Sequence, residues 1–157
     1  MPGSITMAEL STMLLTVMGW DNSHAHAFRV GGTNYLPLGE IDEDDEIDEE
    51  KVTTLEAVGG ELHFFYDYDF GDGWVHEVLV EGVVRSIPSL QFAVCLDGEN
   101  ACPPEDVGGV SGYAEFLHAV LDPDDLAHDS YLEWVGGSFD PETFDLAGAN
   151  ARLQRLR

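Results

Sequence analysis

Positive charge is the scarcest property of this sequence. Its 157 residues include six lysines and arginines against 31 aspartates and glutamates, so the formal net charge is −25. Lys51 is the only lysine, and three of the five arginines (Arg152, Arg155 and Arg157) lie in the last six positions. Direct binding to nucleic acid depends on neutralising phosphates with cations, and an acidic surface repels nucleic acid and anionic membranes. The composition therefore argues against direct nucleic-acid binding and against attachment to a membrane.

Long apolar runs and a recognisable leader are missing as well. No stretch approaches the roughly 18 apolar residues that a transmembrane helix needs, and no basic segment followed by an apolar one stands at the N-terminus. We therefore expect a cytoplasmic protein. The chain is long enough, and with 44% hydrophobic residues apolar enough, to bury a substantial core. We expect a single domain over residues 1–157.

Cysteine is also rare, since only Cys95 and Cys102 occur. In a reducing compartment such a pair is more typical of thiols than of a structural disulfide. The tight Cys-x2-Cys spacing of zinc ribbons and fingers is absent. Three roles stay open for the pair: buried structural thiols, metal ligands, or a redox couple.

The acidity is densest over residues 40–50, which carry nine carboxylates and no cation. Like charges packed this closely repel one another, so we expect an exposed loop. One explanation is adaptation of the whole surface to a high-salt cytoplasm, where screening removes the self-repulsion. The other is a loop that recruits a basic partner or a divalent cation, although the segment lacks the glycine of an EF-hand turn.

Hydrophobic periodicity and turn residues predict an α+β fold. Thr6 and Glu9 form a capping box for a helix that Gly19 ends. The turn Gly71-Asp72-Gly73 joins two long alternating segments into a β-hairpin. We expect strands over 24–30, 33–36, 62–70, 74–84 and 92–95, a short helix over 54–58, and helices over 113–121, 126–135 and from 145 onward. Strands precede helices, which favours a mainly antiparallel sheet with a central long hairpin, an N-terminal helix and a helical C-terminal third.

Carboxylates, histidines, cysteines and aromatic residues alternate in the middle of the chain, and two interpretations compete for them. His24 and His26 share one face of a strand and can reach one ion, with further donors from neighbouring loops. The candidate metal ligands are His24, His26, Asp69, Asp72, His76, Cys95 and Cys102. Three or four of them would hold zinc and leave a position for an activated water. Alternatively, Asp69 and Asp72 cap the hairpin turn, and the cysteines act as small buried hydrophobes.

The same motifs resemble the Ri-plasmid Orf-three-like domain, which is also found in insertion-element passenger proteins. The resemblance rests on Met18-Gly19-Trp20-x-x-Ser23-His24-x-His26, Tyr66-x-Tyr68-Asp69-Phe70-Gly71-Asp72-x-Trp74-x-His76, Cys95 to Gly109 with Pro103-Pro104-Glu105-Asp106, and Trp134-x-Gly136-Gly137-x-Phe139-Asp140-Pro141. Within these motifs Trp20, Tyr68, Trp74, Glu105 and Asp106 are candidate binding residues. The resemblance covers nearly the whole chain and implies a link to plasmid or transposon biology, without implying an activity.

The chain departs from the family pattern at its N-terminus, where the family's extra edge strand is not seen before the first helix. A missing strand would leave an unpaired sheet edge that favours self-association. We therefore predict a non-enzymatic binding or assembly module that meets a protein partner or a second copy. The alternative is a zinc-type metal-binding protein that uses the central constellation, with hydrolysis as its activity.

Overall fold

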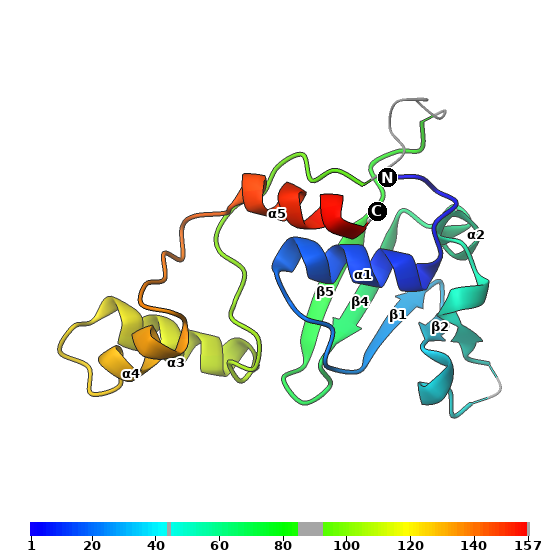
Figure 1. The fold of residues 1–157 in the computed structure, drawn as a ribbon. Coiled ribbons are helices and arrows are strands. Elements are labelled where there is room, and N and C mark those ends of the chain that lie inside the picture. The colour runs from blue at the N-terminus through cyan, green and yellow to red at the C-terminus, as the bar shows by residue number, and fades with distance from the viewer. Residues whose placement is uncertain (44, 85–92, 157) are drawn as a thin grey trace.

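A five-stranded sheet forms the centre of the structure, a computed structural model that describes residues 1–43, 45–84 and 93–156 (Figure 1). The strand order is β3-β2-β1-β4-β5, and every neighbouring pair is antiparallel except β2 and β3. The strands are β1 (His26–Val30), β2 (Thr33–Leu36), β3 (Ile47–Asp48), β4 (His63–Tyr68) and β5 (Trp74–Leu79). The predicted α+β class with a central long hairpin, β4–β5, is confirmed.

Helix α1 (Met7–Met18) begins and ends where the sequence predicts. The Glu9 amide donates to Thr6 Oγ1 at 3.1 Å, and the Thr6 amide donates to Glu9 Oε2 at 2.8 Å, which completes the capping box. Gly19 ends the helix at a φ of 88°, a conformation that glycine adopts without steric cost. Arg152 also donates to two carbonyl oxygens of the last turn, at 2.9 and 3.0 Å, and so ties helix α5 (Leu146–Leu153) to α1.

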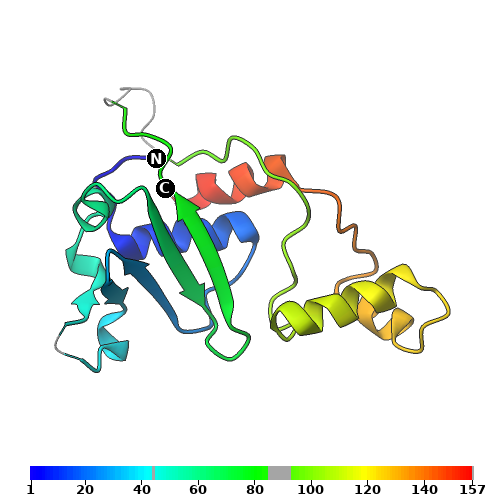
Figure 2. The ribbon, with the colours of Figure 1, turned by 180° about the vertical axis from the view of Figure 1, so that it is seen from behind.

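Helices α1 and α5 lie side by side over one face of the sheet (Figure 1). Seen from behind, the opposite face carries no helix among the described residues (Figure 2). The strand alternation explains the layering, because Phe64, Tyr66 and Tyr68 of β4 all point into the helix-covered side and are almost fully buried. Met7, Leu10 and Leu15 of α1 meet them, together with Phe28 of β1.

Helices α3 (Gly109–Leu121) and α4 (His128–Trp134) project away from the sheet (Figures 1 and 2). We call residues 109–139 the helical projection. The ring of Phe116, which is fully buried, packs against those of Tyr131, Trp134 and Phe139 at centroid distances of 5.3, 5.9 and 5.0 Å. No residue of α4 is itself buried. The projection therefore has a small aromatic core of its own, apart from the core beneath the sheet.

The acidic segment differs from the predicted exposed loop at its C-terminal end. Strand β3 and the 3-10 turn η2 (Glu49–Lys51) follow a first 3-10 turn, η1 (Leu38–Glu40), and lead to the short predicted helix α2 (Thr54–Val58). Asp48 and Glu49 are buried, with 7% and 4% of their surface exposed. Glu49 is paired with the buried side chain of His26, and a charged side chain can be buried when it is paired.

Other boundaries differ from the predictions by up to five residues. Strand β5 ends at Leu79 rather than at residue 84, because its register with β4 ends at the His63–Leu79 pair, and helix α3 begins at Gly109 rather than at residue 113. Strand β1 begins at His26 rather than at residue 24, and the last turn, η3 (Gln154–Leu156), extends α5. Residue 92 of the strand predicted over 92–95 lies outside the described residues, and the remaining residues, 93–95, belong to no strand, so this prediction is not confirmed. No helix in the described ranges is long and apolar enough to cross a membrane.

Candidate functional site

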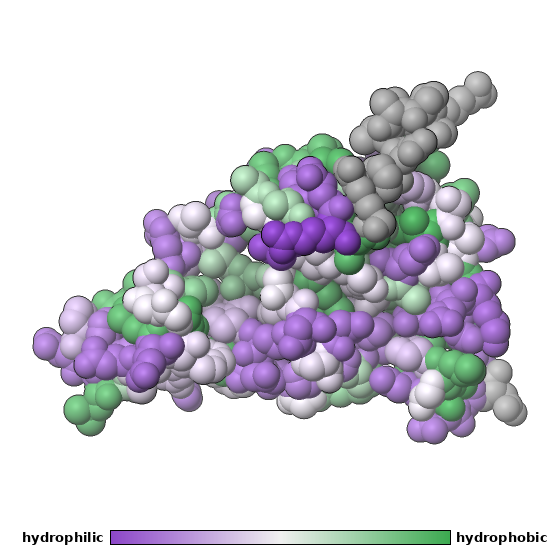
Figure 3. All heavy atoms as spheres, viewed as in Figure 1, coloured by the Kyte–Doolittle hydropathy of each residue, from purple (hydrophilic) through white to green (hydrophobic). Residues whose placement is uncertain are grey.

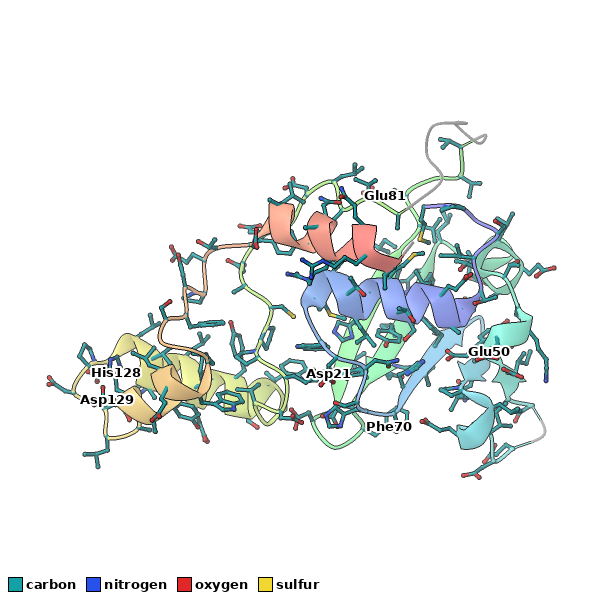
Figure 4. The ribbon with its side chains drawn as sticks, viewed as in Figure 1. Asp21, Glu50, Phe70, Glu81, His128 and Asp129 are labelled. Atoms are coloured by element: carbon teal, nitrogen blue, oxygen red, sulfur yellow. The ribbon has the colours of Figure 1, made fainter. Side chains whose placement is uncertain are left out.

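Three loops meet at one end of the sheet, beside the helical projection. We call them together the loop junction: residues 20–24 after α1, residues 69–73 between β4 and β5, and residues 102–109 before α3. Each loop holds one non-glycine residue with a positive φ, namely Asn22 (63°), Asp69 (52°) and Asp106 (60°). Asparagine and aspartate are the side chains that tolerate this conformation best, so the residue types suit the sharp loop geometry. Figure 4 places Asp21 on the side of the sheet that faces the projection.

The hairpin turn is capped as the architectural interpretation predicts. Asp69 Oδ1 accepts hydrogen bonds from the amides of Gly71 at 3.0 Å and Asp72 at 3.2 Å. Asp72 Oδ2 in turn accepts from the amide of Gly108 at 3.0 Å. A Cβ at Gly109 would lie 2.2 Å from the Asp72 carbonyl oxygen. The turn of the β4–β5 hairpin and the start of α3 are thus held in direct backbone contact.

Glu105 links the 102–109 loop to the 20–24 loop and to strand β4. One carboxylate oxygen accepts from the Asp21 amide at 2.8 Å, and the other accepts from the Tyr68 hydroxyl. The Trp20 indole nitrogen donates to the Pro103 carbonyl oxygen at 2.9 Å. Burial, together with the nearby Glu105 carboxylate, raises the pKa of Tyr68 to about 12. Tyr68 is therefore a neutral donor at physiological pH.

An aromatic group lies under these polar contacts. Trp20 stacks on Tyr68 with ring centroids 5.1 Å apart and meets Trp74 at 5.7 Å and His76 at 5.6 Å. His76 Nδ1 lies 3.0 Å from the Tyr66 carbonyl oxygen. Burial lowers the pKa of His76, so the ring is held neutral, with Nδ1 as the donor. His76 is thereby committed to the aromatic core and does not join the other predicted metal ligands.

A smaller cluster does bring candidate ligands together: His24, Asp69 and Asp106. One ligand atom from each lies within 4.8 Å of the others. His24 Nδ1 is 3.7 Å from Asp69 Oδ2, and His24 Nε2 is 2.8 Å from Asp106 Oδ1. The second contact is out of line for a hydrogen bond, so the buried Nε2 has no hydrogen-bond partner among the described residues. An imidazole with two carboxylates is a donor set that suits a divalent transition metal.

His26 lies on the same side of the sheet as His24 but has another partner. Its Nε2 lies 3.1 Å from both carboxylate oxygens of Glu49, and both side chains are less than one-tenth exposed. The structure therefore places His26 beside Glu49 and outside the cluster that contains His24. Sequence reasoning missed the role of Glu49, because it sits among nine carboxylates and only the fold singles it out.

The two cysteines are free and lie in different surroundings. Burial raises the pKa of Cys102 to about 12, and its side chain packs against the main core, which fits a structural thiol. The backbone of Cys95 exchanges hydrogen bonds with the Asn150 side chain of α5, at 3.0 and 2.8 Å. Neither cysteine belongs to a cluster of metal-binding side chains within the described ranges.

Two open hollows lie where the loop junction meets the helical projection, and both are lined by Trp134. The first, of about 380 Å³, is bounded by Asp106 and Val107 of the junction and by Ser130, Tyr131 and Trp134 of α4. The second, of about 410 Å³, is lined on the sheet side by Trp20, Pro103, Pro104 and Glu105 and on the projection side by Trp134 and Phe139. Motif residues thus line a surface recess. Of the α4 residues that line it, Trp134 lies in a motif of the family resemblance, whereas Ser130 and Tyr131 had no signal beyond a predicted helix.

Comparison with known proteins agrees with the resemblance read from the motifs. A family described as plasmid pRiA4b ORF-3-like protein matches residues 1–148. The uncharacterized protein y4hQ of Sinorhizobium fredii (strain NBRC 101917 / NGR234) is 39% identical over 153 residues, which cover 95% of this chain and 75% of that protein. The crystal structure of the protein of unknown function MM3350 from Methanosarcina mazei Go1 superposes with a TM-score of 0.81 at 29% identity, over 93% of this chain and 84% of that one.

Proposed function

The chain belongs to the plasmid pRiA4b ORF-3-like protein family, and we propose that it acts as a non-enzymatic binding or assembly module. One observation carries this proposal: the motif side chains are engaged with one another and hold the helical projection against the sheet. Glu105, Asp72 and Trp20 each form a hydrogen bond to another loop of the junction, and Asp69 caps the hairpin turn within its own loop. Such a junction presents a rigid surface, which suits recognition.

The described residues also lack the usual arrangement of covalent catalysis. A nucleophile is activated by a hydrogen-bonded base, and among the described residues no serine or cysteine side chain is hydrogen bonded to a histidine. The thiol of Cys102 is held in its protonated form, because its pKa is raised to about 12 by burial. A link to insertion elements and a cytoplasmic place of action stay predictions from the sequence.

The proposal is tested by isolating the chain from its own host under mild conditions and rebuilding any complex from purified components. Light scattering on the chain alone measures self-assembly, for which β3 and β5 are the outermost strands among the described residues. We expect either a defined stoichiometric complex with a protein or a defined oligomer. A monomer that forms no reconstituted complex, yet turns over a substrate, would contradict the proposal.

A second candidate function is divalent metal binding at His24, Asp69 and Asp106. The observation in its favour is the buried Nε2 of His24, which lies 2.8 Å from Asp106 Oδ1 but has no hydrogen-bond partner among the described residues, while Asp69 Oδ2 lies 3.7 Å from Nδ1 of the same ring. Burying a polar atom without a partner is unfavourable, and a bound cation would satisfy it. Three protein ligands leave coordination positions open, as in catalytic zinc sites, where the ion activates a water.

Elemental analysis of untagged protein, purified without chelator, tests this second function. Metal binding predicts about one equivalent of zinc or a similar ion, lost in His24→Gln and Asp106→Asn. His63→Gln is the matched control, because His63 is a partly exposed histidine paired with Glu77 outside the cluster. Metal content that is unchanged in His24→Gln and Asp106→Asn would exclude the cluster as the site.

A further inference from the structure

We propose that the two hollows beside Trp134 form one docking groove for a basic polypeptide segment that carries an apolar or aromatic side chain. This inference rests on the proposed binding function and specifies its site and the chemistry of its partner. The groove consists of the first hollow, between Asp106 and Ser130, and the second hollow, between Trp20 and Phe139, with Trp134 shared by both. The hollows are of about 380 and 410 Å³, large enough for one bulky side chain each.

The anchor of the groove is Trp134, which is 48% exposed although its ring contacts the buried Phe116. A large aromatic residue that is held on one side and open on the other is typical of residues that dominate binding energy at interfaces. Pro103 and Pro104 stiffen the opposite wall, and the Trp20–Pro103 hydrogen bond holds that wall to the sheet. The groove is therefore preorganised, which reduces the entropy lost on binding.

Charge identifies the partner. Positions 105 to 145 contain eleven aspartates and glutamates and no lysine or arginine. Glu105 and Asp106 line the hollows directly, and Asp129 lies on the outer part of α4 (Figure 4). Figure 3 shows apolar side chains over the projection bordered by hydrophilic ones. An aromatic recess lined by Glu105 and Asp106, within a segment that has no lysine or arginine, is complementary to a lysine- or arginine-rich segment with an apolar anchor.

Two other occupants, a second copy of this chain and an anionic ligand, suit the charge of the groove less well. A second copy of this chain would bring its own negative charge to the groove, since each chain carries −25. An anionic ligand, such as nucleic acid, would meet the same repulsion. A cationic peptide gains from the charge and fills the hollows.

The test selects ligands from a random library of 12-residue peptides displayed on phage, using the immobilised full-length chain. The most enriched peptide is then synthesised with a fluorescent label, and its affinity is measured by anisotropy at 0.05 and 0.5 M NaCl. We expect lysine or arginine together with an aromatic or leucine residue, and weaker binding at high salt. Trp134→Ala should reduce affinity about tenfold or more.

A second variant guards against loss of folding in Trp134→Ala. Ser130 is exposed on α4 and lines the first hollow, so Ser130→Lys adds bulk and a positive charge there with no loss of core packing. It should also weaken binding about tenfold, with an unchanged circular dichroism melt. Leu126→Ala is the matched control, because Leu126 is fully exposed on the same projection but lines neither hollow.

Four outcomes would overturn the inference. Enriched peptides without positive charge would reject the partner chemistry, and a library that yields no binder would reject the groove as a peptide site. Equal affinity for wild type, Ser130→Lys and Trp134→Ala would place binding elsewhere and leave the general binding function standing. A dimer in light scattering that Trp134→Ala dissociates would assign the groove to a second copy.

Discussion

Replacing Asp69 with alanine should destabilise the protein through the hairpin turn. The substitution removes the acceptor of two backbone hydrogen bonds, at 3.0 and 3.2 Å. Hydrogen bonds to a charged group contribute about 1.5–3 kcal/mol each when buried. The Gly71 amide lies at an exposed turn, where water can take the place of the carboxylate. The two hydrogen bonds together therefore contribute about 1–2 kcal/mol to the free energy of unfolding.

The backbone conformation adds a second contribution. Residue 69 has a φ of 52°, and alanine in the left-handed region costs about 1–2 kcal/mol. The free energy of unfolding should thus fall by about 2–4 kcal/mol. For a chain of this length, each kcal/mol lowers the melting temperature by about 2–4 °C, so the expected loss is roughly 5–15 °C.

Asp69→Asn distinguishes the loss of the turn hydrogen bonds from the loss of the negative charge. Asparagine tolerates a positive φ and retains an acceptor oxygen, so its melting temperature should fall by less than about 4 °C. The melts are followed by circular dichroism in chelator at one fixed salt concentration, so that bound metal makes no contribution. Asp45→Ala is the control, since it removes the same charge from an exposed position. A melting temperature of Asp69→Ala within about 2 °C of wild type would refute the capping role, and equal losses in alanine and asparagine would assign the effect to charge.

Three further predictions concern groups at or near the loop junction. Burial lowers the pKa of His76, so below the ordinary value of about 6.5 the unfolded chain binds a proton that the folded chain does not, and stability decreases as the pH is lowered. The destabilisation by His76→Gln, measured by urea unfolding, should therefore be larger at pH 7.5 than at pH 5.5, and an equal destabilisation at both pH values would contradict this sign. Because burial raises the pKa of Cys102 to about 12, iodoacetamide at pH 8 should leave this thiol unmodified in the native protein and alkylate it in urea, as mass spectrometry would show; rapid native labelling would disprove its burial. Gly109→Ala brings a Cβ to 2.2 Å from a carbonyl oxygen of the hairpin turn at a φ of 66°, so it should lower the melting temperature by several degrees. Gly82→Ala, whose Cβ would meet no described atom within 4 Å, should not, and equal melting temperatures would show that the turn and α3 move apart without cost.

The local elements could be predicted because their signals lie within a few residues of one another. The capping box of Thr6 and Glu9 and the stop at Gly19 placed α1 to the residue. Alternation over residues 62–70 predicted the first strand of the hairpin, on whose buried face Tyr66 and Tyr68 lie, and the glycine-rich turn placed the hairpin. These features depend on backbone dihedral preferences and side-chain period, which are properties of short segments.

The site was predicted only in part, because its partners come from distant segments. The sequence indicated that His24 and His26 share a face, but Glu49, 23 residues after His26, pairs with His26 alone. Asp106 was identified as a motif residue, and its approach to His24 appears only when residues 102–109 fold back on the sheet. Loop closure of this kind is decided by packing and backbone geometry over the whole chain.

By itself, the sequence determined the strand and helix periods, the caps, the family and the extreme acidity. Those properties follow from residue type and spacing. The tertiary structure alone decided that the motif residues join three loops, that His76 and Cys102 lie partly buried against the core, and that Trp134 faces a recess between the sheet and the helical projection. Each of these features depends on burial and hydrogen bonding between groups that are distant in the sequence. The order of residues in any one segment does not specify which distant groups meet.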